Sequence, residues 1–158
     1  MNRTAESVIA AFAAKGWRLA TAESCTGGLV AGRLTDVAGS SAVVIGGVVA
    51  YANDVKERLL GVPRSVLATA GAVSEESAVA MAEGGRRLFD VDAVVSITGI
   101  AGPGGGTSAK PVGLVHFALA TAKSTTHRRV VLPGDRRQVR DASVDVALNL
   151  LLSAARLG

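Results

Sequence analysis

The longest apolar run in the chain, from Ala42 to Ala52, constrains the fold more than any other feature of the sequence. With 11 residues it is far too short to cross a membrane as a helix, which takes about 20. Its Val and Ile residues favour a strand, and apolar residues at consecutive positions are typical of a strand covered on both faces. We therefore expect Val43–Tyr51 to form a buried strand.

Strand-like and helix-like segments alternate along the rest of the chain. Strands are expected at Trp17–Ala22, Val43–Tyr51, Ala93–Thr98, Val112–Thr121 and Thr126–Leu132. Helices are expected at Thr4–Lys15, Gly27–Val37, Asn53–Leu60, a short turn after Pro63, Ser74–Leu88 and Asp135–Leu157. This alternation predicts an α/β fold, a three-layer α/β/α sandwich around a mixed and mostly buried sheet. Because no repeat or linker interrupts it, we expect one domain over residues 1–158.

Composition excludes several classes of protein. Apolar residues make up 49% of the 158 residues and charged residues 19%, which is incompatible with intrinsic disorder. Cys25 is the only cysteine, so there is no intramolecular disulfide, and no cluster of residues has metal-ligand spacing. With no signal-peptide pattern in Met1–Glu6, we expect a cytoplasmic protein without a metal. The apolar excess favours a homo-oligomer, a dimer or a trimer.

Positive charge is concentrated in Gly104–Arg140, which holds seven basic residues and one acidic residue. Such a segment attracts phosphate, whether on a nucleotide or on nucleic acid, or it forms an ordinary solvated face. The segment offers Phe117 and His116 but no aromatic platform on which bases could stack. We therefore do not expect nucleic acid as the partner.

The first segment that could carry chemistry is Thr21–Gly28, between an expected strand and an expected helix. Ligands and catalytic groups in α/β proteins gather at the carboxyl ends of strands. Ser24 or Thr26 could simply cap the helix. Alternatively, the turn presents a nucleophile, and backbone N–H groups near Gly27 and Gly28 form an oxyanion hole.

Two side chains in this turn could be the nucleophile. Cys25 is intrinsically the better one, but it needs a histidine to hold it as a thiolate. His116 and His127 both lie in late strands, and nothing in the sequence places either beside Cys25, which could equally be a small core residue. Ser24 needs a base as well.

Lys56 is a candidate for that base, because the pKa of a lysine falls readily when the side chain is buried. It lies near the start of the helix that follows the long apolar strand, so it can reach the same edge of the sheet. The alternative is an exposed helix lysine paired with Glu57 or Asp54.

The second segment is the glycine-rich run from Thr98 to Ser108. It is not a dinucleotide-binding motif, because Lys110 and Pro111 follow where a helix should begin. It is not a Walker A loop either, because no Gly-Lys-Ser/Thr occurs. It remains a loop whose N–H groups could approach a phosphate closely, or a mobile connector.

Several motifs in one order resemble the CinA C-terminal domain family, whose characterised activity is nicotinamide-nucleotide amidohydrolase. The resemblance extends from about Val8 to Leu151. The motifs are Thr21-Ala22-Glu23-Ser24-Cys25-Thr26-Gly27-Gly28, Gly71-Ala72-Val73-Ser74, Thr98-Gly99-Ile100-Ala101-Gly102-Pro103-Gly104-Gly105-Gly106, Lys110-Pro111-Val112-Gly113 and Pro133-Gly134-Asp135-Arg136.

The resemblance implies a serine amidohydrolase that converts nicotinamide mononucleotide to nicotinate mononucleotide and ammonia. Ser24 matches the nucleophile, Lys56 matches the general base, and Tyr51 matches a tyrosine bordering the site. No metal or organic cofactor is required. The alternatives are a nucleotide-sensing module that keeps the fold without turnover, and a basic nucleic-acid-binding protein.

Substrate-binding residues are expected in two places. N–H groups of Thr26, Gly27 and Gly28 would hold the oxyanion of the reaction intermediate. The 5′-phosphate would lie against the glycine-rich loop and one basic side chain. The candidates for this second group are Thr98, Gly99, Gly102, Arg136 and Arg140.

Overall fold

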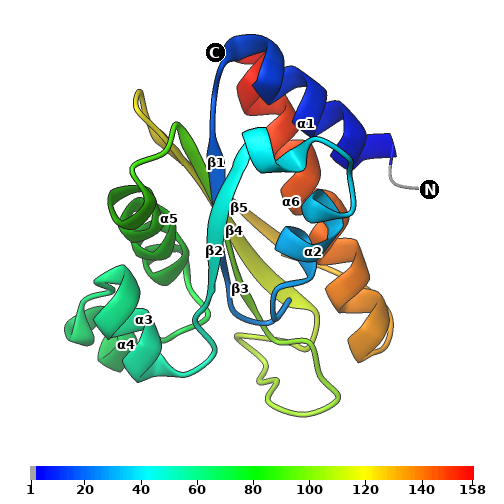
Figure 1. The fold of residues 1–158 in the computed structure, drawn as a ribbon. Helices are drawn as coiled ribbons and strands as arrows, with labels where there is room; N and C mark the ends of the chain where they lie inside the picture. The colour runs from blue at the N-terminus through cyan, green and yellow to red at the C-terminus, as the bar shows by residue number, and fades with distance from the viewer. Residues whose placement is uncertain (1–2) are drawn as a thin grey trace.

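The computed structural model describes residues 3–158, so Met1 and Asn2 of the expected domain lie outside it. One five-stranded sheet has the order β2-β1-β3-β4-β5 (Figure 1). Its strands are β1 (Leu19–Glu23), β2 (Val44–Val49), β3 (Ala93–Gly99), β4 (Leu114–Thr121) and β5 (Thr125–Val131). β1 pairs in parallel with both β2 and β3, whereas β4 is antiparallel to β3 and to β5. The expected mixed sheet is confirmed.

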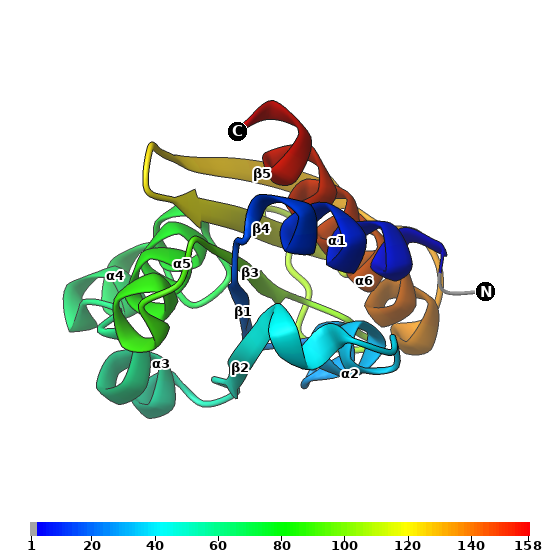
Figure 2. The same ribbon diagram turned by 45° about the horizontal axis from the view of Figure 1, so that its top comes forward.

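Helices cover both faces of the sheet (Figures 1 and 2). One layer holds α1 (Arg3–Lys15), α2 (Leu29–Thr35) and α6 (Arg136–Leu157), and a short 3-10 helix, η1 (Ser40–Ala42), precedes β2. The opposite layer holds α3 (Asn53–Leu60), α4 (Arg64–Thr69) and α5 (Glu75–Phe89). The three-layer sandwich predicted from the sequence is therefore confirmed. Within residues 3–158, no helix is long and apolar enough to cross a membrane.

β2 corrects the expectation that the longest apolar run is covered on both faces. It is an edge strand, and only Val48 among its residues is buried, while Ile45 and Val49 are 42% and 50% exposed. An edge strand has a neighbour on one side only, so the helical layers cover it incompletely. A run of apolar residues predicted the strand but not its place in the sheet.

The parallel pairing decides where a site can form. β1, β2 and β3 end at the same edge of the sheet, and the segments that follow them begin with Ser24, Ala50 and Ile100. The residue after β1 is tied to β3, because the N–H of Ser24 donates to the carbonyl of Ile97 at 2.9 Å. The chain after β2 is tied to β1, because the N–H of Ala50 donates to the carbonyl of Glu23 at 2.8 Å. These loops therefore converge.

α3 lies at this edge because α5 comes unusually close to it. A Cβ added at Gly84 on α5 would overlap the carbonyl oxygen of Leu60, the last residue of α3. Leu60 itself is buried in an apolar cluster that includes Met81 of α5 and side chains of β1, β2 and β3. Glycine at position 84 thus sets the distance between α5 and the helix that carries Lys56.

We predict that Gly84→Ala lowers the free energy of unfolding by about 3 kcal/mol, because the added methyl group must push α3 away from α5. Chemical denaturation followed by circular dichroism measures the change. Gly32→Ala is the matched control, since Gly32 is a helical glycine of α2 with nothing within 4 Å of an added Cβ. The control should be neutral or stabilising by up to about 1 kcal/mol. Equal effects at both positions would contradict the packing described.

Candidate active site

A cavity of about 230 Å³ lies at the carboxyl edge of the parallel strands. Six of the residues predicted from the sequence line it: Ser24, Tyr51, Lys56, Thr98, Gly99 and Arg136. Its other lining residues are Cys25, Asn53, Ala72, Val73 and Ala101. Segments that follow β1, β2 and β3 thus meet around one small space, together with the loop before α5 and the start of α6.

Ser24 and Lys56 form the polar centre of this cavity. Lys56 Nζ lies 3.0 Å from Ser24 Oγ, within hydrogen-bond distance. Nζ also donates to the carbonyl oxygens of Ala50 at 2.9 Å and Tyr51 at 3.0 Å. Lys56 is only 1% exposed and Ser24 8% exposed. The chain after β2 therefore supplies both the lysine and the two carbonyls that hold its amine.

The surroundings of Lys56 favour its neutral form. Burial lowers the pKa of its amine below the ordinary value of 10.5, because desolvation penalises the ammonium ion. The neighbouring acids are paired elsewhere: Glu57 with Arg64 at 2.8 Å and Asp54 with Arg58 at 3.7 Å. The alternative of an exposed lysine paired with Glu57 or Asp54 is therefore wrong.

The chain turns sharply after Ser24, and two glycines permit the turn. Gly27 and Gly28 have φ angles of 59° and 98°, a region that side chains disfavour, so α2 begins at Leu29 rather than at the expected Gly27. The Gly27 N–H donates to the carbonyl of Ser24 at 3.0 Å. Among residues 3–158, by contrast, no acceptor is bonded to the N–H groups of Thr26 and Gly28. The turn thus leaves these two backbone donors without a protein acceptor in the described part of the chain.

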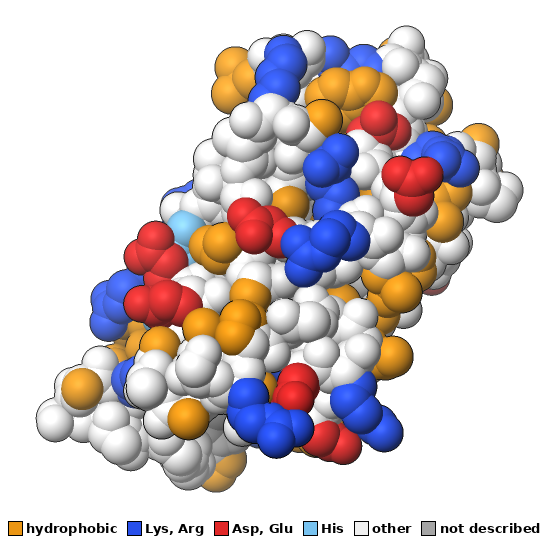
Figure 3. Space-filling view, turned by 90° about the vertical axis from the view of Figure 1, so that its left-hand side faces the viewer, with side chains coloured by type: hydrophobic (Ala, Val, Ile, Leu, Met, Phe, Trp, Pro, Cys, Tyr) orange, Lys and Arg blue, Asp and Glu red, His pale blue; other side chains and the backbone are white. Residues whose placement is uncertain are grey.

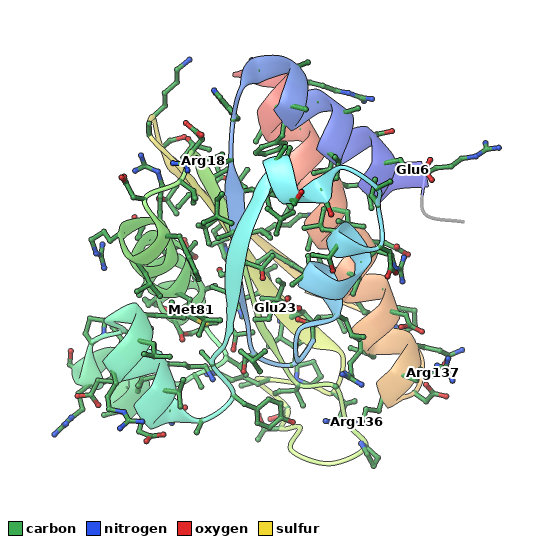
Figure 4. The ribbon with its side chains drawn as sticks, viewed as in Figure 1. Glu6, Arg18, Glu23, Met81, Arg136 and Arg137 are labelled. Atoms are coloured by element: carbon green, nitrogen blue, oxygen red, sulfur yellow. The ribbon has the colours of Figure 1, made fainter. Side chains whose placement is uncertain are left out.

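Glu23 is a functional candidate to which the sequence reasoning assigned no role. Its carboxylate is 1% exposed and lies between β1 and α2 (Figure 4). It accepts hydrogen bonds from the hydroxyls of Thr21 and Thr26 and from the N–H groups of Val30 and Ala31. An acid at the end of an apolar strand is the signal that could have indicated it, because buried carboxylates require partners.

Arg140 lies outside the cavity and binds the same turn from α6. Its Nε donates to the carbonyl of Cys25 at 3.1 Å and its Nη2 to the carbonyl of Thr26 at 3.3 Å. Thr26, Gly27, Gly28 and Gly102 likewise do not line the cavity. The guanidinium of Arg140 is thus directed at the backbone behind Ser24.

Arg136 and Tyr51 meet at the mouth of the cavity. Arg136 Nη2 donates to the hydroxyl of Tyr51 at 3.1 Å, and its Nη1 donates to the carbonyl of Gly102 at 2.9 Å. Both side chains belong to exposed residues, and Figure 4 shows Arg136 beside the glycine-rich loop at the lower end of the sheet. A cation, a phenol and the loop therefore lie together at the entrance.

Thr98 and Gly99 shape the wall of the cavity. The Thr98 hydroxyl donates to the carbonyl of Ala72 at 2.7 Å and so fastens the loop before α5 to β3. A Cβ at Gly99 would come within 2.8 Å of the Leu114 carbonyl oxygen, so glycine is needed for close packing against β4. Gly102 is similar, because a Cβ there would lie 2.5 Å from a methyl group of Val112.

The two histidines do not assist Cys25. His116 and His127 stack on β4 and β5 with Nδ1 and Nε2 2.8 Å apart, and neither lines the cavity. Burial raises the pKa of the Cys25 thiol to about 11, so the thiolate is scarce at neutral pH. The structure therefore offers Ser24, and not Cys25, a basic partner.

Another hollow, of about 330 Å³, lies between Trp17, the hairpin of β4 and β5, and the end of α6. Its lining is mostly apolar and contains no hydrogen-bonded serine–lysine pair. Within the described residues, no three His, Cys, Asp or Glu side chains gather where they could hold a metal ion. The cavity at Ser24 is the candidate active site.

These features define an α/β protein with a buried serine–lysine pair at the carboxyl edge of its parallel strands. The family model of the CinA C-terminal domain matches residues 1–155, and the chain belongs to this family. The resemblance inferred from the motifs is thus confirmed.

Individual relatives agree with this assignment. A CinA-like protein of Mycolicibacterium gilvum (strain PYR-GCK) is 58% identical over 140 residues, which is 88% of this chain and 33% of that protein. The chain spans about a third of the length of the first curated relatives it matches.

Solved structures share the fold closely. The competence/damage inducible protein CihA from Agrobacterium tumefaciens is 45% identical with a TM-score of 0.94, covering 96% of this chain and 93% of that one. A CinA superfamily protein, KP700603 from Klebsiella pneumoniae 700603, is 34% identical with a TM-score of 0.95, covering 99% and 98%.

We predict that iodoacetamide labels the Cys25 thiol slowly at neutral pH and faster as pH rises towards the thiol pKa of about 11. Because Cys25 is the only cysteine, the mass of the intact protein reports the modification directly. Labelling at neutral pH as fast as that of a free cysteine would contradict the assignment and restore Cys25 as a candidate nucleophile.

Proposed function

We propose that this chain is a serine amidohydrolase that hydrolyses the carboxamide of nicotinamide mononucleotide to nicotinate mononucleotide and ammonia. The observation that carries the proposal is the 3.0 Å separation between Lys56 Nζ and Ser24 Oγ in a buried cavity. A nucleophile within hydrogen-bond reach of a base is the arrangement that acyl-transfer chemistry needs. The family resemblance supports the choice of substrate.

Lys56 acts first as the general base. A neutral amine has two N–H donors and one lone pair, and the carbonyls of Ala50 and Tyr51 accept from both donors. The lone pair then faces Ser24 Oγ and takes its proton as Oγ attacks the carboxamide carbon. The positive charge of the pyridinium ring withdraws electrons from that carbon and favours the attack.

The tetrahedral intermediate then collapses to an acyl-enzyme. The N–H groups of Thr26 and Gly28 are the candidate donors to the oxyanion, whereas that of Gly27 is occupied within the turn. Protonated Lys56 donates its proton to the leaving nitrogen, the C–N bond breaks, and ammonia departs. Lys56 then deprotonates a water molecule, which attacks the ester. Protonated Lys56 returns the proton to Ser24 Oγ as the ester C–O bond breaks and nicotinate mononucleotide is released.

Arg136 is the favoured ligand of the 5′-phosphate. Its guanidinium lies at the mouth of the cavity with the Tyr51 hydroxyl, where a phosphate could exchange places with these internal partners. Arg140 is less suited, because its guanidinium already binds the carbonyls of Cys25 and Thr26. No step of this scheme requires a metal or an organic cofactor.

A nucleotide-sensing module would use the same cavity without turnover, and the experiment below separates it from an enzyme. A broad nucleic-acid surface has less support. On the face seen in Figure 3, acidic and basic side chains are interspersed and form no continuous basic patch.

We predict that the purified chain releases ammonia from nicotinamide mononucleotide, and that Ser24→Ala and Lys56→Ala each lower kcat by at least about a thousandfold. A coupled assay of ammonia measures the rate. Cys25→Ala and the exposed-lysine control Lys15→Ala should keep most of the activity. Saturable nucleotide binding without ammonia release by the unmodified chain would favour the sensing module. Loss of activity in Cys25→Ala alone would assign the nucleophile to Cys25.

A further inference from the structure

Glu23 is a buried carboxylate whose hydrogen bonds all lie around the nucleophile turn. Oε1 accepts from the Thr26 hydroxyl at 2.7 Å and the Val30 N–H at 2.9 Å. Oε2 accepts from the Ala31 N–H at 3.0 Å and the Thr21 hydroxyl at 3.2 Å. One side chain therefore joins β1, the turn and the first residues of α2.

The four partners suit a carboxylate and no similar side chain. All four are donors, and the two carboxylate oxygens together supply the lone pairs they need. A glutamine would supply one oxygen and turn an NH2 group towards one backbone N–H and one threonine hydroxyl, and only the hydroxyl could accept from it. The N-cap residue of α2 is Gly28, which has no side chain, so Glu23 alone satisfies the N–H groups of Val30 and Ala31.

Glu23 does not touch the reacting atoms. Successive side chains of a strand point to opposite faces of the sheet. Ser24 accordingly meets Lys56 in the layer of α3, whereas Glu23 meets α2 on the other face. The bond from Thr26 to Glu23 closes a short loop that contains Ser24 and Cys25, so the backbone of the nucleophile is fixed from behind.

Arg140 completes the restraint from the outside. Glu23 accepts from the Thr26 hydroxyl in the turn and from N–H groups at the start of α2. Arg140 donates to the backbone carbonyl oxygens of two residues of the turn, Cys25 and Thr26. A Cβ at Gly27 would lie 3.3 Å from Arg140 Nη2, so the guanidinium packs closely on the turn. Opposite charges thus hold the two sides of one short segment.

We propose that Glu23 is a positioning residue for the nucleophile turn, which it holds so that Ser24 Oγ faces Lys56. This inference rests on the proposed amidohydrolase function. Displacements of about 1 Å in such geometry can cost on the order of a hundredfold in rate. A positioning role therefore predicts a loss of kcat, whereas a residue that only adds stability would lower the melting temperature without lowering kcat.

Glu23→Gln tests the proposal in the full chain with nicotinamide mononucleotide as the substrate. We expect kcat to fall at least tenfold while KM changes less than twofold, because the phosphate subsite at Arg136 is untouched. Val8→Ala is the control for lost stability: Val8 is fully buried on α1, which carries no residue of the cavity, and its side chain makes none of the hydrogen bonds that hold the turn. The melting temperature of each variant is recorded beside its kinetics.

Thr26 provides a milder pair of variants if Glu23→Gln does not fold. Thr26→Val removes one of the four donors and should lower kcat severalfold, and Thr26→Ser keeps the hydroxyl and should restore it. A folded Glu23→Gln with unchanged kcat would overturn the proposal, as would a loss of kcat in Val8→Ala equal to that in Glu23→Gln. If only the Thr26 variants fold, equal kcat values in Thr26→Val and Thr26→Ser would overturn the proposal. Absence of turnover in the unmodified chain would instead refute the proposed function itself, and this inference with it.

Discussion

The buried amine of Lys56 is the group on which the rest of the site depends. Removing a lysine amine from water is costly, and the fold offsets that cost with two backbone carbonyls, of Ala50 and Tyr51, and with Ser24 Oγ at 3.0 Å. The same burial lowers the pKa of the amine and so favours its neutral form, which is the form that the proposed general base needs. An ordinary helix lysine thereby becomes a partner for a serine that has no histidine near it.

This arrangement requires elements from both helical layers to be held at one edge of the sheet. Gly84 lets α5 approach the end of α3, and α3 carries Lys56 into the cavity. On the other face, Glu23 and Arg140 restrain the turn that carries Ser24. Arg136 reaches the entrance from the start of α6 and meets Tyr51 there. The layers therefore do more than cover the sheet, since each fixes one half of the serine–lysine pair.

Much of this organisation follows from local sequence pattern. Alternating strands and helices predicted the sandwich. The family resemblance, rather than the residues alone, predicted the site, and Ser24, Tyr51, Lys56, Thr98, Gly99 and Arg136 line the cavity, whereas Thr26, Gly27, Gly28, Gly102 and Arg140 do not. Pattern could not place β2, because an apolar run looks alike in the centre and at the edge of a sheet. Local pattern also could not show that Arg136 lines the cavity while Arg140 binds the turn behind Ser24, and it could not show the hydrogen bonds of Glu23. Such roles depend on contacts between residues far apart in the chain, 114 positions for Arg140 and Thr26.

The most direct test of the account is to trap the covalent intermediate. Acid quenching during turnover of nicotinamide mononucleotide, followed by peptide mass spectrometry, should reveal an ester on Ser24. Its mass increment should equal the substrate minus ammonia, and the adduct should be absent from Ser24→Ala. Turnover that proceeds with the adduct on Cys25, or at an undiminished rate in Ser24→Ala, would contradict the central claim that Ser24 is the nucleophile activated by Lys56.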